Sequence, residues 1–247
     1  MIREHLFSKV IPVDKYFRWR GGEVSRLEGF SDAVFGFALT LLVVSLEVPQ
    51  TLADLLRTMR GFMAFAVSFA ILIWIWYEHY IFFRRYGLQD AVTILLNALL
   101  LFLILFYIYP LKYLFTALFN KIPLFYSGGP TLDGEPGQIT TLMIIYSFGF
   151  FLIFLTFFLL HFHAYRKRDL LELDEIELVQ THGRIRSSFI SMGIALTSIT
   201  ISVVWGGSAA PIAGMVYGLM GPAYGVNGYF VGRRMSELAE STQHSVS

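Results

Sequence analysis

The sequence predicts an all-α integral membrane protein whose subunit crosses the bilayer about six times. Hydrophobic residues make up 55% of the 247 residues, and the mean hydropathy is +0.60. A typical soluble domain is less apolar than this. The apolar residues form long runs, and most basic residues fall between alternate runs, as expected for loops on one side of a membrane.

A membrane-spanning helix needs about 20 mostly apolar residues. The runs that meet this requirement lie near 29–48, 62–83, 91–118, 139–164, 187–205 and 210–231. Pro110 predicts a kink in the third run. The last run contains several glycines and the prolines Pro211 and Pro222, which membrane helices tolerate. We therefore interpret it as the sixth span.

The distribution of basic residues predicts the orientation. With the N-terminus in the cytosol, the cytosolic side receives Arg3, Lys9, Lys15, Arg18, Arg20, Arg26, Arg84, Arg85, Arg166, Lys167, Arg168, Arg184, Arg186, Arg233 and Arg234. The other side receives only Arg57, Arg60, Lys112 and Lys121. Cytosolic loops carry an excess of Lys and Arg, so both termini are expected in the cytosol.

The chain divides into an arm, a membrane domain and a tail. We expect a cytosolic N-terminal arm over 1–28, a six-helix membrane domain over 29–232 with a cytosolic connector at 166–186, and a cytosolic tail over 233–247. The arm lacks a continuous apolar core, so it does not read as a cleavable signal peptide. No hydrophilic stretch is long enough for a separate domain. Function is therefore expected within the membrane bundle or at its mouths.

Several functional classes are excluded or disfavoured. The sequence has no Cys, which excludes disulfides, thiolate catalysis and iron–sulfur clusters. It has no HExxH or GxSxG motif, so we expect neither an enzyme nor a bound cofactor. His161 and His163 are spaced i, i+2 and point to different sides of a helix, so we expect no resident metal at this pair. The net charge of +1 gives no indication of a nucleic-acid partner.

The stretch RLEGFSDAVFGFALTLLVVSLEVP places Arg26, Ser31 and Asp32 at the head of the first apolar run. A carboxylate at the edge of the hydrocarbon costs a few kcal/mol unless it is paired. We expect Ser31 and Asp32 to be buried among adjacent helices. On a helical projection a separate stripe spans an arc of about 100°. This stripe consists of Phe37, Thr40, Leu41 and Val44.

The second apolar run supplies candidate partners for Asp32. Trp76 and His79 lie near its cytosolic end and can donate hydrogen bonds to a carboxylate. An interfacial aromatic belt would also account for the aromatic residues there, and a stripe such as that of the first run can equally face lipid or pack. A further alternative is a proton-conducting protein or secondary cation transporter that uses Asp32, Glu78 and His79 as carriers.

Arg26, Phe30, Ser31 and Asp32 spell RxxxFSD at the start of the first membrane helix. This motif resembles the signature of the transmembrane protein 175 family of potassium channels. Trp76 and His79 are similar to the Trp and His of that family's second helix. The resemblance implies a six-helix subunit without a re-entrant carbonyl filter, held together by this motif network. It also implies a homotetramer in the plasma or inner membrane of a prokaryote, with a pore lined by the first helix.

The resemblance assigns roles to the stripe. The family's constricting position, commonly Ile or Leu, falls on Phe37, and Thr40 matches a Thr whose hydroxyl can transiently meet a passing K⁺ ion. Leu41 and Val44 complete the lining, and Glu47 is expected at the external mouth. An apolar ring provides no oxygens to replace the water of an ion. We therefore expect K⁺ and other monovalent cations to pass, with modest selectivity for K⁺ over Na⁺, and closure by a hydrophobic gate.

Overall fold

The computed structural model describes residues 17–44, 49–132 and 135–246. These parts are helical, as predicted. The helices are α2 (Arg26–Val44), α3 (Leu52–Arg60), α4 (Phe62–Tyr86), α5 (Ala91–Phe119), α6 (Pro136–Arg166), α7 (Glu175–Trp205), α8 (Ala210–Met215) and α9 (Met220–Val246). Short 3-10 turns lie at Pro123–Phe125, Gly206–Ala209 and Val216–Leu219.

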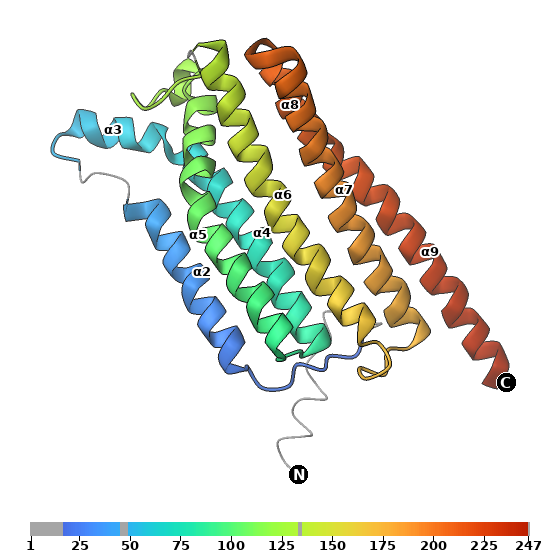
Figure 1. The fold of residues 1–247 in the computed structure, drawn as a ribbon. Coiled ribbons are helices and arrows are strands. Elements are labelled where there is room, and N and C mark those ends of the chain that lie inside the picture. Colours follow the sequence, from blue (N-terminus) through green and yellow to red (C-terminus); the bar gives the residue numbers. More distant parts are fainter. Residues whose placement is uncertain (1–16, 45–48, 133–134, 247) are drawn as a thin grey trace.

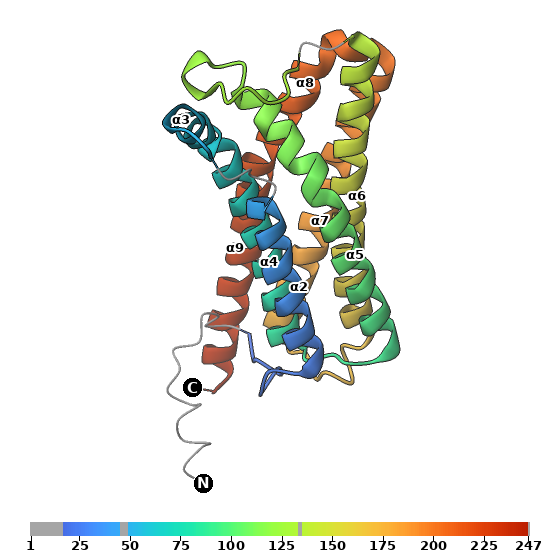
Figure 2. The same cartoon turned by 90° about the vertical axis from the view of Figure 1, so that its left-hand side faces the viewer.

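The long helices run side by side and form a bundle (Figure 1). At one edge α2 packs against α4 and α5, and at the opposite edge α9 packs against α7. The view turned by 90° shows α2 at the front of the bundle (Figure 2). Since α4 and α5 lie behind α2, one side of this helix is left exposed by the described part of the chain.

Four helical segments of the described chain are long and apolar enough to cross a membrane, at 62–86, 91–119, 137–166 and 175–240. The last of these contains both the fifth and the sixth predicted runs. It turns back after α7 at Gly206, whose positive φ of 68° suits glycine. The first predicted run corresponds to α2, although residues 45–48 of that run lie outside the described residues.

Short polar signals set the ends of the helices. Asp90 caps α5 by accepting hydrogen bonds from the backbone N–H groups of Val92 and Thr93. Asp174 and Glu177 form a capping box at the start of α7. Gly87 ends α4 with a φ of 59°. By contrast, α5 continues through Pro110.

Residues 17–22, which we call the N-terminal strap, cross the end of the bundle where α4 ends and α7 begins. Phe17 is buried, and the N–H of Gly21 donates to the carbonyl of Arg84 over 3.1 Å. The strap also passes close to Gly87, where an added Cβ would lie 3.0 Å from the backbone of Arg20. This close approach accounts for glycine at that position.

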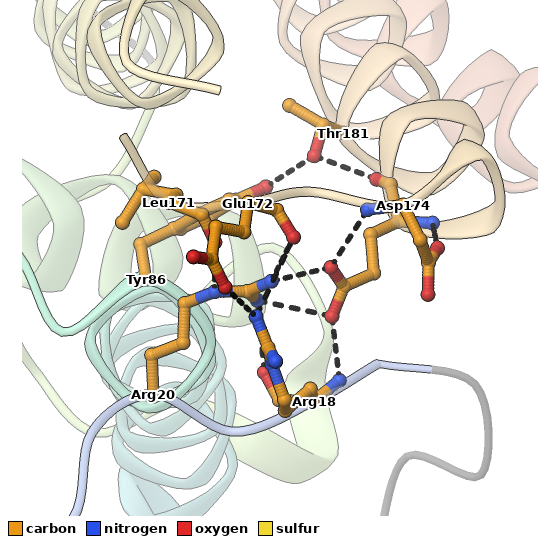
Figure 3. A network of polar contacts seen from close by, with 8 residues as sticks. Arg18, Arg20, Tyr86, Leu171, Glu172, Asp174 and Thr181 are labelled. Atoms are coloured by element: carbon orange, nitrogen blue, oxygen red, sulfur yellow. Dashed lines mark hydrogen bonds and ion pairs between the residues drawn. The ribbon is translucent and has the colours of Figure 1, made fainter. Parts of the chain in front are cut away.

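The strap is anchored to the connector between α6 and α7 (Figure 3). The Arg20 guanidinium pairs with the Glu177 carboxylate over 2.5 Å and donates to the carbonyl of Leu171 over 2.7 Å. The backbone N–H of Arg18 donates to Glu177 over 2.7 Å. The described part of the predicted arm is thus held to the bundle by these hydrogen bonds, just before the start of α2.

Candidate functional site

The side of α2 that turns away from the bundle carries most of the predicted stripe. Phe37 is 58% exposed, Thr40 is exposed and Leu41 is half-buried. The Val44 side chain and Glu47 lie outside the described residues. The opposite side of the helix is buried in the core through Phe35, Ala38 and Leu42. This division follows from helical periodicity and from the packing of one side of α2 against α4 and α5.

Around Phe37, the exposed side of α2 combines an apolar ring with one hydroxyl, that of Thr40. The Thr40 hydroxyl donates to the Phe37 carbonyl over 2.7 Å. Because its proton is used in this way, the lone pairs of the Thr40 oxygen remain available to a cation. An added Cβ at Gly36 would meet no atom within 4 Å, so the helix surface is open beside Phe37.

A buried polar chain lies behind this face and joins three helices. The Ser31 hydroxyl donates to the Leu27 carbonyl over 2.8 Å, so its oxygen accepts the bond from Asn97 Nδ2 at 2.9 Å. That bond turns Asn97 Oδ1 toward His79 Nε2, 2.8 Å away. His79 must then carry its proton on Nε2. The chain ties α2 to α5 and α5 to α4.

Asp32 lies differently from the sequence-based expectation. Ser31 is buried as expected, but Asp32 is exposed on the surface of the single chain. One of its oxygens accepts a hydrogen bond from the indole Nε1 of Trp76 over 2.8 Å. Arg26 and Phe30 are also exposed, and Arg26 pairs with none of the described residues. The motif therefore divides into a buried serine and an exposed group.

The three residues considered as proton or cation carriers are not brought together. Glu78 is paired with Arg184 of α7, at 2.7 and 2.9 Å from Nη1 to the two carboxylate oxygens. His79 contacts Asn97, and Asp32 contacts Trp76. Each group has its own partner, so they do not form a continuous chain.

Three residues that bind α2 or its neighbours were not singled out from the sequence. Asn97 was an isolated amide within the apolar run ILLNALLLF, and that isolation was the available signal. Arg184 was considered only as one of the basic residues of the cytosolic connector. Lys112 donates from Nζ to the Leu42 carbonyl near the end of α2 over 3.1 Å, which suits a cation at a helix C-terminus.

The histidines near the end of α6 serve structural roles. His161 contacts the Phe157 carbonyl, and His163 contacts the Asp90 carboxylate over 3.0 Å. Within the described parts of the chain, no group of three His, Cys, Asp or Glu side chains is placed to hold a metal ion.

Comparison with known proteins gives consistent matches. Residues 26–107 match the family model described as endosomal/lysosomal potassium channel TMEM175. A protein of Marivirga tractuosa named potassium channel is 38% identical over 243 residues, covering 95% of this chain and 98% of that protein. A potassium channel of Chamaesiphon minutus is 35% identical over 96 residues, covering 36% of this chain and 47% of that protein.

Solved structures give the same result for the fold. A crystal structure of a variant of the potassium channel MtTMEM175, bound to a nanobody fusion protein, matches with a TM-score of 0.78 and 37% identity. The match covers 90% of this chain and 99% of that one. A TMEM175 homologue from Chamaesiphon minutus, described as a lysosomal potassium-selective channel, has a TM-score of 0.54 at 24% identity over 84% of this chain and 96% of that one.

Proposed function

Since this chain belongs to the TMEM175 family of potassium channels, we propose that it conducts K⁺ through a pore lined by α2 at the centre of a homotetramer. The observation that carries the pore assignment is the face of α2 that the described residues leave exposed, with Phe37 58% exposed and Thr40 beside it. Around these two residues the face is apolar except for one hydroxyl, which suits a pore that touches ions only briefly.

The same face sets the expected selectivity. At the constriction, Phe37 rings from neighbouring subunits would offer no oxygen ligands in place of water. Removing water from K⁺ without such ligands is costly, so ions cross largely hydrated. Thr40, one turn away, supplies the one available hydroxyl. Selectivity for K⁺ over Na⁺ is therefore modest, and a narrow apolar ring closes readily by losing its water.

The proposed topology places six helices in the bilayer of a prokaryotic cell membrane, with both termini in the cytosol. The basic side chains of Arg20, Arg84, Lys167 and Arg184 all belong to the end of the bundle where α4 and α6 end and α7 begins. A concentration of Lys and Arg at one end is typical of the cytosolic side. The return of α9 along α7 supplies the sixth crossing.

The test of conduction uses purified protein in planar bilayers with K⁺ on one side and Na⁺ on the other. The expected result is unitary current steps with a reversal potential that shifts moderately toward the K⁺ equilibrium potential. Slow, saturable flux without unitary steps would favour a transporter. Selectivity as strict as that of a carbonyl filter would contradict the apolar pore.

The constriction has its own test. Phe37→Ala removes the bulky ring from the exposed face and should raise the unitary conductance. Phe35→Leu is the matched control, because Phe35 is on the buried side of the same helix at 2% exposure. If Phe37→Ala leaves conductance unchanged, the narrowest point lies elsewhere along α2.

A further inference from the structure

A second polar site lies on the far side of the bundle from the proposed pore. A cavity of about 390 Å³ is lined by residues of α4, α6, α7 and α9, and α2 contributes none of its lining residues. It lies toward the end of the bundle that carries the N-terminal strap, because Gln180 and Arg184 belong to the first three turns of α7.

The cavity wall holds a buried acceptor without a partner. The Gln180 side chain is only 8% exposed, and its Oε1 accepts no hydrogen bond from the described residues. An unpaired buried acceptor is destabilising, so native proteins normally satisfy it with protein, water or a ligand. Because Gln180 lines the cavity, a group inside the cavity can donate to it.

The wall also carries guanidinium donors. Arg184 directs Nη1 to both oxygens of Glu78, which leaves its Nη2 and Nε without a hydrogen bond among the described residues. A guanidinium presents donors on two edges, so the second edge can bind an oxyanion. Arg85 adds another guanidinium, which stacks on Phe17.

The wall also has an extensive apolar part, which favours a lipid over a free anion. It includes Trp74, Phe154, Phe157, Val231 and Met235, which belong to helices long and apolar enough to span a membrane. Basic pockets between membrane helices on the cytosolic side suit acidic headgroups. A free phosphate would find the guanidinium but would leave this apolar surface uncovered.

We propose that this cavity binds an acidic phospholipid, whose phosphate meets Arg184 and whose headgroup hydroxyl donates to Gln180. Phosphatidylglycerol has both groups: an anionic phosphate and hydroxyls that can donate. Phosphatidylcholine lacks the hydroxyl donor and the net negative charge. The site is separate from α2, so its test does not depend on the proposed pore.

The test is native mass spectrometry of the detergent-solubilised protein with phosphatidylglycerol or phosphatidylcholine of the same acyl chains. The wild type should bind phosphatidylglycerol about tenfold more tightly, as expected for a charge-assisted hydrogen bond. Gln180→Met should lower that affinity about fivefold by removing a neutral hydrogen bond. Equal binding of the two lipids, or an unchanged affinity in Gln180→Met, would overturn the proposal.

Further variants separate the site from its alternatives. The double variant Glu78→Gln/Arg184→Gln keeps an uncharged pair in place and should abolish the headgroup preference. Arg233→Gln is the control for general attraction of acidic lipids, because Arg233 is exposed, pairs with Glu237 and does not line the cavity. A preference lost equally in Arg233→Gln would assign it to the surface and overturn the site.

Two measurements complete the design. Without lipid, the Gln180→Met variant should have a melting temperature equal to or above that of the wild type, because the change removes an unpaired buried acceptor. A lower melting temperature would mean that Gln180 already has a partner, and it would overturn the assignment of Gln180 to the lipid site. Inorganic phosphate at millimolar concentration should not displace phosphatidylglycerol. Full displacement would identify a free-anion site instead.

Discussion

Replacing Asn97 with Leu tests the buried polar chain that positions α2. The change removes the 2.9 Å bond to Ser31 and the 2.8 Å bond to His79, and it leaves the Nε2–H of His79 buried without an acceptor. Ser31 keeps its own bond to the Leu27 carbonyl. The damage therefore concentrates on His79, which is 1% exposed.

The size of the effect follows from these contacts. Hydrogen bonds between membrane helices contribute about 0.6 kcal/mol each on average, and an orphaned buried donor costs about 1–3 kcal/mol. The extra apolar contact of Leu offsets about 1 kcal/mol. Asn97→Leu should thus lower the free energy of unfolding by about 1–3 kcal/mol, which changes the unfolding equilibrium constant about 5–150-fold.

The assay is reversible unfolding in mixed micelles, followed by tryptophan fluorescence and arranged as a double-mutant cycle with Ser31→Ala. The two changes should be non-additive, with a coupling of about 0.5–1.5 kcal/mol, since they share one hydrogen bond. Ser147→Ala is the control, because it removes the 3.0 Å bond to Ser198 between α6 and α7 without touching α2. Strict additivity of Asn97→Leu and Ser31→Ala would refute the continuous chain.

Three further predictions concern other contacts. Asp32→Asn keeps an acceptor for Trp76, so the monomer should fold. We expect the change to reduce tetramer assembly, measured by native mass spectrometry, more than it reduces the selectivity for K⁺ over Na⁺. Normal tetramers that lose their cation preference would contradict this. Arg20→Ala should lower the melting temperature, because it removes the donors to Glu177 and Leu171. Arg18→Ala should have little effect, because it removes only an exposed ion pair with Glu172. Equal losses in the two variants would contradict the stabilising role of Arg20 in the N-terminal strap. Burial of the Asp90 carboxylate opposes its ionisation, but hydrogen bonds from His163 and Lys167 outweigh burial and hold its pKa well below the usual value. This stabilisation is complete above the unfolded pKa of about 4 and is lost as the pH falls below it, so acid titration of stability should flatten in Asp90→Asn, and an unchanged profile would exclude the contribution.

The positions of the helices were predictable where one continuous run of apolar residues marks each helix. Long apolar runs gave the positions of the long helices, and α2 begins at Arg26, directly beside the RxxxFSD motif. The return of the chain after Gly206 was harder to read, because α8 and the 3-10 turns interrupt the last run. Local sequence patterns do not predict whether the chain continues straight or turns back after such an interruption.

The contacts between distant segments were not predictable from local sequence. Arg20 and Glu177 are far apart along the chain, and the local capping box of Glu177 gives no indication of its partner Arg20. Asn97 gave a signal as a lone amide in an apolar helix, but its partners depend on the register between α5 and α2. Asp32 was expected to be buried, whereas the packing of α2 leaves it exposed beside Trp76.

Accessibility of the two faces of α2 is the most direct test of the channel assignment. The chain has no native Cys, so a single cysteine can be placed at will and probed with a charged, membrane-impermeant thiol reagent during recording. Thr40→Cys, on the exposed face, should react and lose current, while Leu42→Cys, fully buried at 0% exposure, should not. The opposite pattern would contradict the account. If the reagent blocked the current of Phe102→Cys, on the exposed face of α5, and left the current of Thr40→Cys unchanged, the conduction path would lie elsewhere.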